Sequence, residues 1–366
     1  MKKSLSRKIA AAVTAAVLAT PLTMGAAPQT AEAGWGSVIG TVIQGEKAKS
    51  ELNQYLKYYN DTDQGRNEML ASMKKKDGVC EDWTITNRVD TIMGNLISAI
   101  GQVDSSIYDK PFQYFVNQQT NFNAYCTLGR NMSINQGIFS VVDNDAEVAV
   151  VLGHEMGHGL KDHPVKGARR SLNSAIFASA IGNAIGAGSV ATNLLYKLYD
   201  SNGITKPQEW EADNLSFEYI THTNYNPGAT AAIWQHYIDK YGDNNSPWTA
   251  RISDHPSNSA RRDNYEKKLE EYSGGHVSVT KDGIVKVNDK EFCIPAATST
   301  MSSHERAFFV QGNLAAAYHN GHNASAATVE GSTVKLGAQP ILTCVAGDED
   351  AQTLADRLNK IKDAKK

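Results

Sequence analysis

The chain has 366 residues, of which 41% are apolar and 20% are charged, and its formal net charge is −3. This length accommodates one large domain or two smaller ones, each with a core of its own. The near-neutral balance lacks the excess of basic residues that a nucleic-acid-binding surface needs, so we set that class of function aside.

Residues 1–33 have the layout of a secretory signal peptide. Basic residues such as Lys2 precede an apolar, Ala-rich stretch over residues 9–19, and Ala31 and Ala33 are the small residues that a signal peptidase reads. We expect cleavage after Ala33 and export to the periplasm, the cell envelope or the extracellular space. The alternative is an uncleaved N-terminal anchor, although the apolar run is short for a spanning helix of about 20 residues.

The first part of the mature chain mixes helices and short strands. The polar segment over residues 45–76 is helical in character, and apolar residues at helical spacing predict a helix over residues 84–103. Aromatic and alternating residues over 111–117 and 122–134 predict short strands, with a turn at residues 128–131.

The next predicted helix begins after Asn144, and Glu147 three residues later is placed to complete a capping box. Residues 148–152 are apolar without a gap, so we expect this helix to be buried on nearly all sides. Gly157 and Gly159 favour its termination.

Residues 174–195 are rich in Ala, Gly, Ser and Asn and allow two interpretations. One is a close-packed core helix or hairpin, and the other is a membrane-inserted segment. The weak apolar character favours the first, so we expect no stable membrane insertion after signal cleavage. A helix over residues 207–221, which opens on a proline, and a helix over residues 229–241 are predicted next, separated by a turn at 225–228.

A change of composition near residue 273 predicts a domain boundary. Strands are expected at residues 277–280, 283–287 and 339–345, and a helix at 304–318. We therefore predict an α+β protein, with a mainly helical first domain (residues 34–272) that contains a small edge sheet. A small β-rich α+β domain (273–347) and a charged helical tail (348–366) are expected to follow.

Four cysteines allow three disulfide pairings. In an oxidising compartment we expect pairing within each half of the chain, Cys80 with Cys126 and Cys293 with Cys344. None of them lies close to another cysteine or to a histidine motif, so a cysteine zinc site is not predicted.

The residues His154, Glu155 and His158 form an H-E-x-x-H pattern within the predicted buried helix. Residues four apart share a helix face, so both imidazoles can reach one ion, and Glu155 is rotated to the side within reach of an attacking water. This spacing is what zinc-assisted peptide hydrolysis requires. The opposing interpretation is a surface helix with a chance pattern, but a buried helix makes two histidines and a glutamate without a ligand costly.

Catalytic zinc takes three protein ligands, and the best candidate for the third is Glu209. Asp213 stands one turn further on the same face and can accept a hydrogen bond from a ligand histidine, whereas Glu211 points elsewhere. The opposing interpretation is a solvated acidic helix start favoured by the helix dipole. We expect one Zn²⁺ per chain at His154, His158 and Glu209.

Several segments carry a resemblance to known proteases. They are, in chain order, Asn123-Ala124-Tyr125, the strand leading to Gly137, the acidic entry to the motif helix, H-E-x-x-H, His163, Glu209-Trp210-Glu211-Ala212-Asp213, and Asp254-His255-Pro256 with Arg261. Over about residues 45 to 270, the chain resembles the HtpX and CAAX-prenyl-endopeptidase-like zinc proteases, peptidase family M48. The resemblance implies a zincin-type fold, zinc binding at His154, His158 and Glu209, catalysis by Glu155 and support by Asp213.

The resemblance also implies that His255 and Arg261 lie against the active-site cleft. His255 has three open interpretations: a donor to the oxyanion, a cap on the open zinc position that keeps the enzyme latent, or a loop histidine packed beside Pro256. Arg261 is a second candidate for the oxyanion donor. His163 is expected to be structural. The other histidines have no partner at ligand spacing and are not expected to bind metal: His222, His236, His276, His304, His319 and His322.

The chain departs from the family pattern in two places. Thr205-Lys206-Pro207 stands where the family usually has Ser-Arg, and the clear spanning helices of the membrane-embedded members are missing, so the chain resembles the soluble envelope branch.

The sequence therefore predicts a zinc-dependent endopeptidase of protein or peptide substrates, which we expect to be misfolded or unassembled exported proteins. Glu155 is expected to accept a proton from the attacking water and to pass it to the leaving amine. The alternative is a zinc-binding, chaperone-like or latent protein of protease fold with little cleavage activity.

Overall fold

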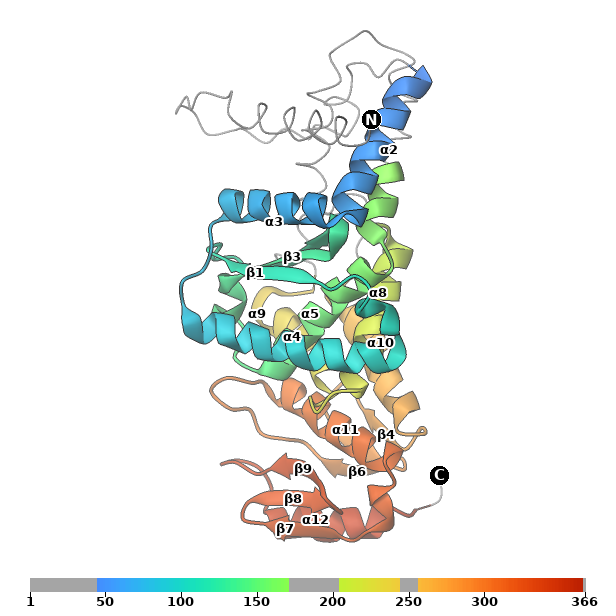
Figure 1. Cartoon of the computed structure of the whole chain (residues 1–366). Helices are drawn as coiled ribbons and strands as arrows, with labels where there is room; N and C mark the ends of the chain where they lie inside the picture. Colours follow the sequence, from blue (N-terminus) through green and yellow to red (C-terminus); the bar gives the residue numbers. More distant parts are fainter. Residues whose placement is uncertain (1–44, 171–203, 244–255, 365–366) are drawn as a thin grey trace.

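The computed structural model describes residues 45–170, 204–243 and 256–364 (Figure 1). The predicted signal peptide, the Ala- and Gly-rich segment at 174–195 and His255 lie outside the described residues. No helix in these three ranges is long and apolar enough to cross a membrane.

The first part of the fold places three helices around a small mixed sheet. The helices are α2 (Gly45–Asp61), α3 (Asp63–Asp77) and α4 (Trp83–Val103). Side chains at the entry points start two of them: Thr62 accepts a hydrogen bond from the N–H of Gly65, and Asp82 accepts one from the N–H of Thr84. The predicted helix over 84–103 corresponds to α4, and the polar segment 45–76 forms two helices that meet at Thr62.

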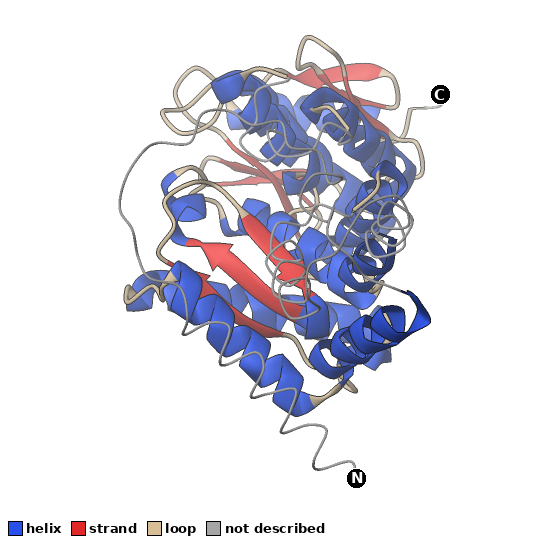
Figure 2. Cartoon of the chain, turned by 90° about the horizontal axis from the view of Figure 1, so that it is seen from above, coloured by secondary structure: helices blue, strands red, loops and turns tan. Residues whose placement is uncertain are grey.

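The sheet has the strand order β1-β3-β2, which places β3 in the centre. The strands are β1 (Gln113–Asn117), β2 (Ala124–Thr127) and β3 (Asn131–Asn135), and short 3₁₀ turns, η1 (Ser105–Ile107), η2 (Leu128–Arg130) and η3 (Gln136–Ser140), flank them. β1 runs parallel to β3, and β2 runs antiparallel to it. Figure 2 shows these strands flanked by helices.

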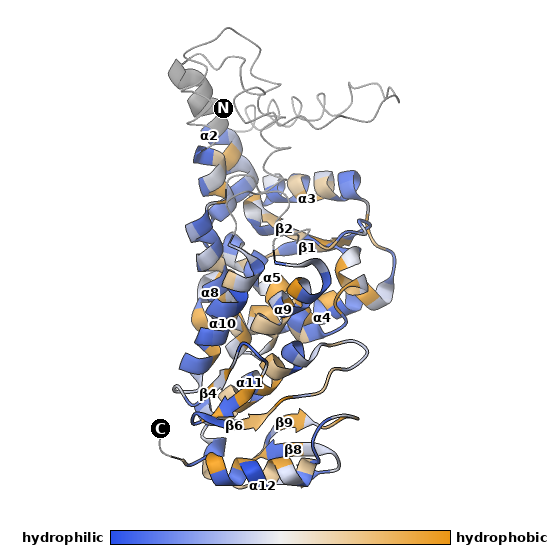
Figure 3. Ribbon diagram, turned by 180° about the vertical axis from the view of Figure 1, so that it is seen from behind, coloured by the Kyte–Doolittle hydropathy of each residue, from blue (hydrophilic) through white to orange (hydrophobic). Residues whose placement is uncertain are grey.

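Four further helices complete the first core. They are α5 (Asp145–Leu160), α8 (Lys206–Thr221), α9 (Ala229–Tyr241) and α10 (Asn258–Tyr272). The core joins apolar residues of α4, α5 and α9 with the inner face of the sheet, among them Leu96, Leu152 and Trp234. Figure 3 shows hydrophobic residues gathered at the centre, where α5 and α9 lie, whereas α10 is mostly hydrophilic.

A second core follows α10. It is built on two antiparallel three-stranded sheets and two helices: β4 (Val277–Val279), β5 (Val285–Val287), β6 (Lys290–Cys293), α11 (Ser303–His319), η4 (His322–Ala324), β7 (Ala327–Glu330), β8 (Thr333–Leu336), β9 (Gln339–Thr343) and α12 (Ala351–Ile361). Helix α11 belongs to both cores, because Phe308 packs in the first and Leu314 in the second. We propose that a second domain begins after α10 and is joined to the first through α11.

The predicted α+β class with a mainly helical first part and a small sheet is confirmed. The segment after residue 348, expected as a charged helical tail, contains the helix α12, but its apolar face is buried: Leu354 and Leu358 belong to the second core.

The predicted disulfides are wrong for this structure. All four cysteines lie in the described part of the chain, and all four are free. Cys80, Cys126 and Cys293 are buried in the apolar cores, where a thiol packs as a small hydrophobic side chain.

Candidate metal centre

The H-E-x-x-H pattern lies on α5, the central helix of the first core. The side chain of Asn144 caps this helix by accepting a hydrogen bond from the N–H of Ala146 (2.9 Å), and every residue from 146 to 160 is buried, as predicted. The predicted capping box is wrong, because Glu147 does not bond back to the cap. Its side chain is instead buried within the protein, at 2% exposure.

Glycines on α5 allow α8 to approach closely. A Cβ atom at Gly157 would lie 3.3 Å from the Cα of Ala212, and one at Gly153 would lie 3.1 Å from the Oγ of Ser216. The hydroxyl of Ser216 on α8 also donates a hydrogen bond to the carbonyl of Val150 on α5 (2.8 Å), which links the two helices. Gly157 therefore serves the contact between the helices, in addition to lying near the end of α5.

This contact brings Glu209, in the first turn of α8, to the two motif histidines. The Nε2 atoms of His154 and His158 lie 3.0 Å apart. Glu209 places its Oε2 3.4 Å from the Nε2 of His154 and its Oε1 3.5 Å from the Nε2 of His158. One ligand atom from each residue lies within 4.8 Å of the others, and all three residues are buried. Two imidazoles and one carboxylate in this arrangement suit a divalent cation such as Zn²⁺.

The charges at the centre are strongly coupled. Burial and Arg261 lower the pKa of His154, but its bonds to Asp213 and Glu209 outweigh them and raise it to about 9. Burial is also the main cause that holds the pKa of His158 well below its ordinary value. The carboxylate of Glu209 thus favours a positive charge at this point of the interior. A cation bound by both Nε2 atoms would supply that charge.

The other ring nitrogen of His154 is held by Asp213. Its Nδ1 lies 2.9 Å from the Oδ1 of Asp213, which is wholly buried. A proton on Nδ1 that is donated to this carboxylate leaves the lone pair of Nε2 directed at the metal centre. The structure thus brings Asp213 to the place that the sequence suggested.

Arg261 contacts the same carboxylate. Its Nε donates to the Oδ2 of Asp213 (2.7 Å), its Nη2 donates to Oδ1, and Nη2 also lies 3.1 Å from the Nδ1 of His154. The guanidinium stacks over the ring of Trp234 at 3.7 Å. These contacts lie on the Nδ1 side of His154, away from the Nε2 atoms, and they hold the carboxylate of Asp213 in place. Tyr265 adds a hydroxyl bond to Asp213 (3.1 Å).

His158 is held by a second chain of hydrogen bonds that sequence reasoning missed. Its Nδ1 lies 2.9 Å from the Nδ1 of His163, and the Nε2 of His163 lies 3.1 Å from the Oε2 of Glu211. With Glu211 ionised, His163 donates from Nε2 and accepts at Nδ1, which assigns the Nδ1 proton of His158 and frees its Nε2. The sequence does place Glu211 only two residues after Glu209. Whether the side chain of Glu211 points toward His163 depends on how the chain turns at residues 161–163.

Glu155 is buried at 6% exposure beside the metal centre. Its Oε2 accepts a hydrogen bond from the backbone N–H of Cys126 on β2 (3.0 Å). Burial is the main cause that raises the pKa of Glu155, to about 7. A carboxyl group with such a pKa can both accept and release a proton near neutral pH.

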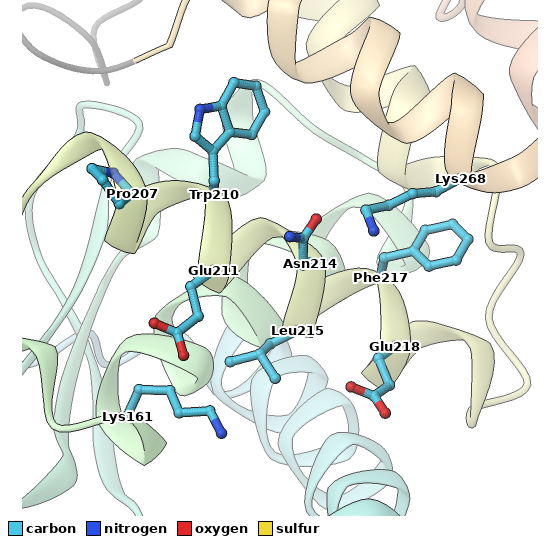
Figure 4. A pocket seen from close by; sticks show the side chains of 9 residues that line it. All are labelled: Lys161, Pro207, Trp210, Glu211, Asn214, Leu215, Phe217, Glu218 and Lys268. Carbon is cyan, nitrogen blue, oxygen red and sulfur yellow. The ribbon is translucent and has the colours of Figure 1, made fainter.

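A pocket of about 580 Å³ lies on the outer side of α8, and none of His154, His158 and Glu209 lines it. Figure 4 shows Glu211 and Lys161 near each other in this pocket, and Lys268 of α10 close to Phe217. Glu211 is the one pocket residue that belongs to the hydrogen-bond chain to His158. His255, the remaining predicted site residue, lies outside the described ranges.

Comparison with known proteins gives the same assignment for this region. The model of peptidase family M48 matches residues 86–268, which include α4, the sheet, α5, α8, α9 and most of α10. Metalloprotease LoiP of Escherichia coli is 25% identical over 179 residues, which cover 48% of this chain and 69% of that protein. The beta-barrel assembly-enhancing protease of Escherichia coli is 21% identical over 169 residues, which cover 43% of this chain.

Mitochondrial metalloendopeptidase OMA1 of Arabidopsis thaliana is 26% identical over 139 residues, 38% of this chain. The chain spans about a third of the length of the beta-barrel assembly-enhancing protease (34%) and of OMA1 (28%). The family match covers half of the chain and contains the whole histidine and glutamate cluster described above. The chain therefore belongs to peptidase family M48 and is a metallopeptidase at the level of its family.

Proposed function

We propose that the protein is a zinc-dependent endopeptidase that binds one catalytic Zn²⁺ through His154, His158 and Glu209. The observation that carries this proposal is the convergence of three ligand atoms within 4.8 Å inside a buried helix pair. Each imidazole is also fixed through its second nitrogen, by Asp213 or by His163. Ligand histidines of catalytic zinc sites are usually held in this way.

The chemistry follows from the groups in place. A zinc ion bound by His154, His158 and Glu209 would supply a Lewis acid at this centre. Glu155 takes the proton of the attacking water on its carboxylate, while the N–H of Cys126 holds Oε2 and thereby orients the side chain. Glu155 then gives this proton to the nitrogen of the leaving amine as the peptide bond breaks. We keep His255 as the candidate donor to the oxyanion and propose a positioning role for Arg261.

We also propose that the enzyme acts on exported proteins that are misfolded or unassembled. The N-terminal sequence has the layout of a signal peptide, and one relative is named for enhancing the assembly of beta-barrels. Location follows from the first of these points, so we expect the mature enzyme in the periplasm, at the cell envelope or outside the cell. Fractionation of cells that express the full chain tests this part.

The test of the activity is the Glu155→Gln variant. We expect it to keep its zinc and to lose casein cleavage by about 10²-fold or more, because an amide cannot accept the proton. Glu81 is exposed and distant in sequence, so Glu81→Gln is a matched control that should cleave like the wild type. Chelator should abolish cleavage by the wild type, and added Zn²⁺ should restore it.

Two outcomes contradict the proposal. Full cleavage by Glu155→Gln would remove Glu155 from its role as the base. A wild-type protein that holds zinc, folds and cleaves no protein substrate would favour the chaperone-like or latent alternative.

A further inference from the structure

The described residues contain a second group of potential metal ligands, remote from the H-E-x-x-H pattern. Glu147, His236 and Glu305 each offer one ligand atom, and these atoms all lie within 4.8 Å of one another. The three residues come from α5, α9 and α11, so the group lies where the first core meets the helix that it shares with the second.

Among the described residues, two buried atoms of this group have no hydrogen-bond partner. They are the Oε1 of Glu147 and the Nε2 of His236. Glu147 is 2% exposed, and the His236 side chain is 16% exposed. A buried carboxylate or imidazole nitrogen without a partner costs about 1–3 kcal/mol or more, so such atoms usually have a ligand, a water or a proton.

Glu305 is held in place at the start of α11. Its Oε2 accepts from the N–H of Ser302 (2.7 Å) in a capping box, and its Oε1 lies 2.8 Å from the Nδ1 of His236. This separation is that of a hydrogen bond, so an ion bound here would take the place of the Nδ1 proton of His236.

The basic group that contacts Glu305 is the imidazole of His236, at 2.8 Å. Among the described residues, no lysine or arginine pairs with Glu147 or Glu305, and the nearby Arg88 is engaged with Asp145 (2.6 Å). Burial and the charge of Glu305 raise the pKa of Glu147 to about 8. Burial, Tyr241 and Glu147 raise the pKa of the adjacent Tyr237, whose buried hydroxyl also has no partner.

We propose that Glu147, His236 and Glu305 form a second, structural binding site for a divalent transition-metal ion of the zinc class. One imidazole and two carboxylates are ligands that Zn²⁺ accepts, and a water can complete a tetrahedral set. An ion here meets the Oε1 of Glu147 and neutralises both carboxylates. It also links α5, the helix that carries His154 two turns later, to α9 and α11.

The test counts metal ions in the full-length protein. After reconstitution with Zn²⁺ alone and removal of the excess, elemental analysis should find two equivalents in the wild type. The variants His236→Asn and Glu209→Ala should each hold one, and the double variant should hold none. His222→Asn makes the same substitution at an exposed histidine at the end of α8 and should keep both equivalents.

A second measurement uses stability. Added Zn²⁺ should raise the Tm of Glu209→Ala but leave that of Glu209→Ala/His236→Asn unchanged, because only a folded-state site shifts the unfolding equilibrium. If His236→Asn does not fold, Glu147→Gln and the wild-type stoichiometry decide the question.

A single equivalent in the wild type, lost in Glu209→Ala, overturns the second site and leaves a proton or a water as the partner of Glu147. Zinc that is unaffected by Glu209→Ala but lost in His236→Asn supports the second site and contradicts the proposed catalytic one.

Discussion

Asp213 accepts hydrogen bonds from three side chains while it is wholly buried. His154 approaches it from α5, and Arg261 and Tyr265 approach it from α10. The burial of its carboxylate is tolerated because Arg261 neutralises it: burial raises the pKa of Asp213, but Arg261 and His154 outweigh this effect and lower it. An ion pair of this kind gives little net stability, but the loss of one partner leaves the other charge buried and alone.

Asp213→Ala is therefore expected to lower the free energy of unfolding by about 3–5 kcal/mol. Urea denaturation in the presence of a chelator measures this without a contribution from bound metal. Asp109 is exposed, so Asp109→Ala serves as the control and should change stability by about 0.5 kcal/mol or less. If Asp213→Ala lowers the free energy of unfolding by less than about 1 kcal/mol, another group compensates the charge of Arg261.

Glu211→Gln tests the second hydrogen-bond chain. The side chain of Glu211 is 46% exposed, so its loss threatens folding less than that of Asp213. We expect the zinc dissociation constant to rise by about 10-fold, because the loss of an outer partner of a ligand histidine costs about 10–100-fold in affinity. Glu218, on the same helix and exposed, supplies the control Glu218→Gln. Equal affinities in a competition assay with a fluorescent chelator would remove Glu211 from this role.

At the scale of elements, the distance between α5 and α8 sets the geometry of the candidate metal centre. Both helices are buried along their contact, and Gly157 faces Ala212 one turn from Glu209. A methyl group at Gly157 would need α8 to shift by a few tenths of an ångström, and this shift carries Glu209 away from the Nε2 atoms.

Gly157→Ala should therefore weaken zinc binding by roughly 10-fold, even though alanine favours the helix by about 0.5–1 kcal/mol. Gly94 on α4 is the matched control, because a Cβ there has nothing within 4 Å. Gly94→Ala should raise the free energy of unfolding by about 0.5–1 kcal/mol and leave zinc affinity unchanged. Unchanged affinity in Gly157→Ala would mean that the helix contact can adapt.

Elements with clear periodicity were predictable. Helix α4 follows from apolar residues at helical spacing, and α9 from the turn before Ala229 and the apolar run after it. Helix α10 was missed, because its charged residues hide a sparse buried face of Arg261, Tyr265 and Leu269. The strands β6, β7 and β8 were missed because each has only four residues, too few for alternation to stand out.

The residues of the candidate metal centre were predictable where their spacing along a single helix indicates them. His154 and His158 follow from the helical period, and Glu209 with Asp213 follows from the same spacing on a second helix. The partners of His158 depend on how the chain turns after Leu160, and the ligand group of His236 joins three helices that are distant in sequence. Such contacts have no local signature, so the sequence could not indicate that His236 lies beside Glu147 and Glu305.

At the scale of the whole molecule, one buried ion pair helps to hold the second core. The side chain of Asp348 is 1% exposed and bonds to Arg306 of α11 at 2.8 Å, and the N–H groups of Ala296 and Val345 donate to it. Burial raises the pKa of Asp348, but Arg306 and these N–H groups outweigh it and lower the pKa below its ordinary value. Its contribution to stability is therefore fully present above about pH 4 and is lost as the pH falls through the folded-state pKa.

Asp348→Asn should have a lower Tm than the wild type at pH 7 and a flatter decline below about pH 4, because the amide binds no proton. Thermal unfolding followed by circular dichroism in chelator, between about pH 2 and pH 7, measures both profiles. Parallel profiles would show that Asp348 titrates alike in the folded and unfolded states.

Helix α11 joins the two cores, and its backbone lies directly against the backbone at the start of α9. A Cβ at Gly312 would lie 2.1 Å from the backbone nitrogen of Gly228, at the start of α9, and Asn226 donates to the carbonyl of Phe309 (2.9 Å). Because one helix fills both interiors, neither half can melt while the other keeps its contacts. Calorimetry should therefore record a single endotherm. A chain truncated before α11 should expose the apolar face of α9 and aggregate.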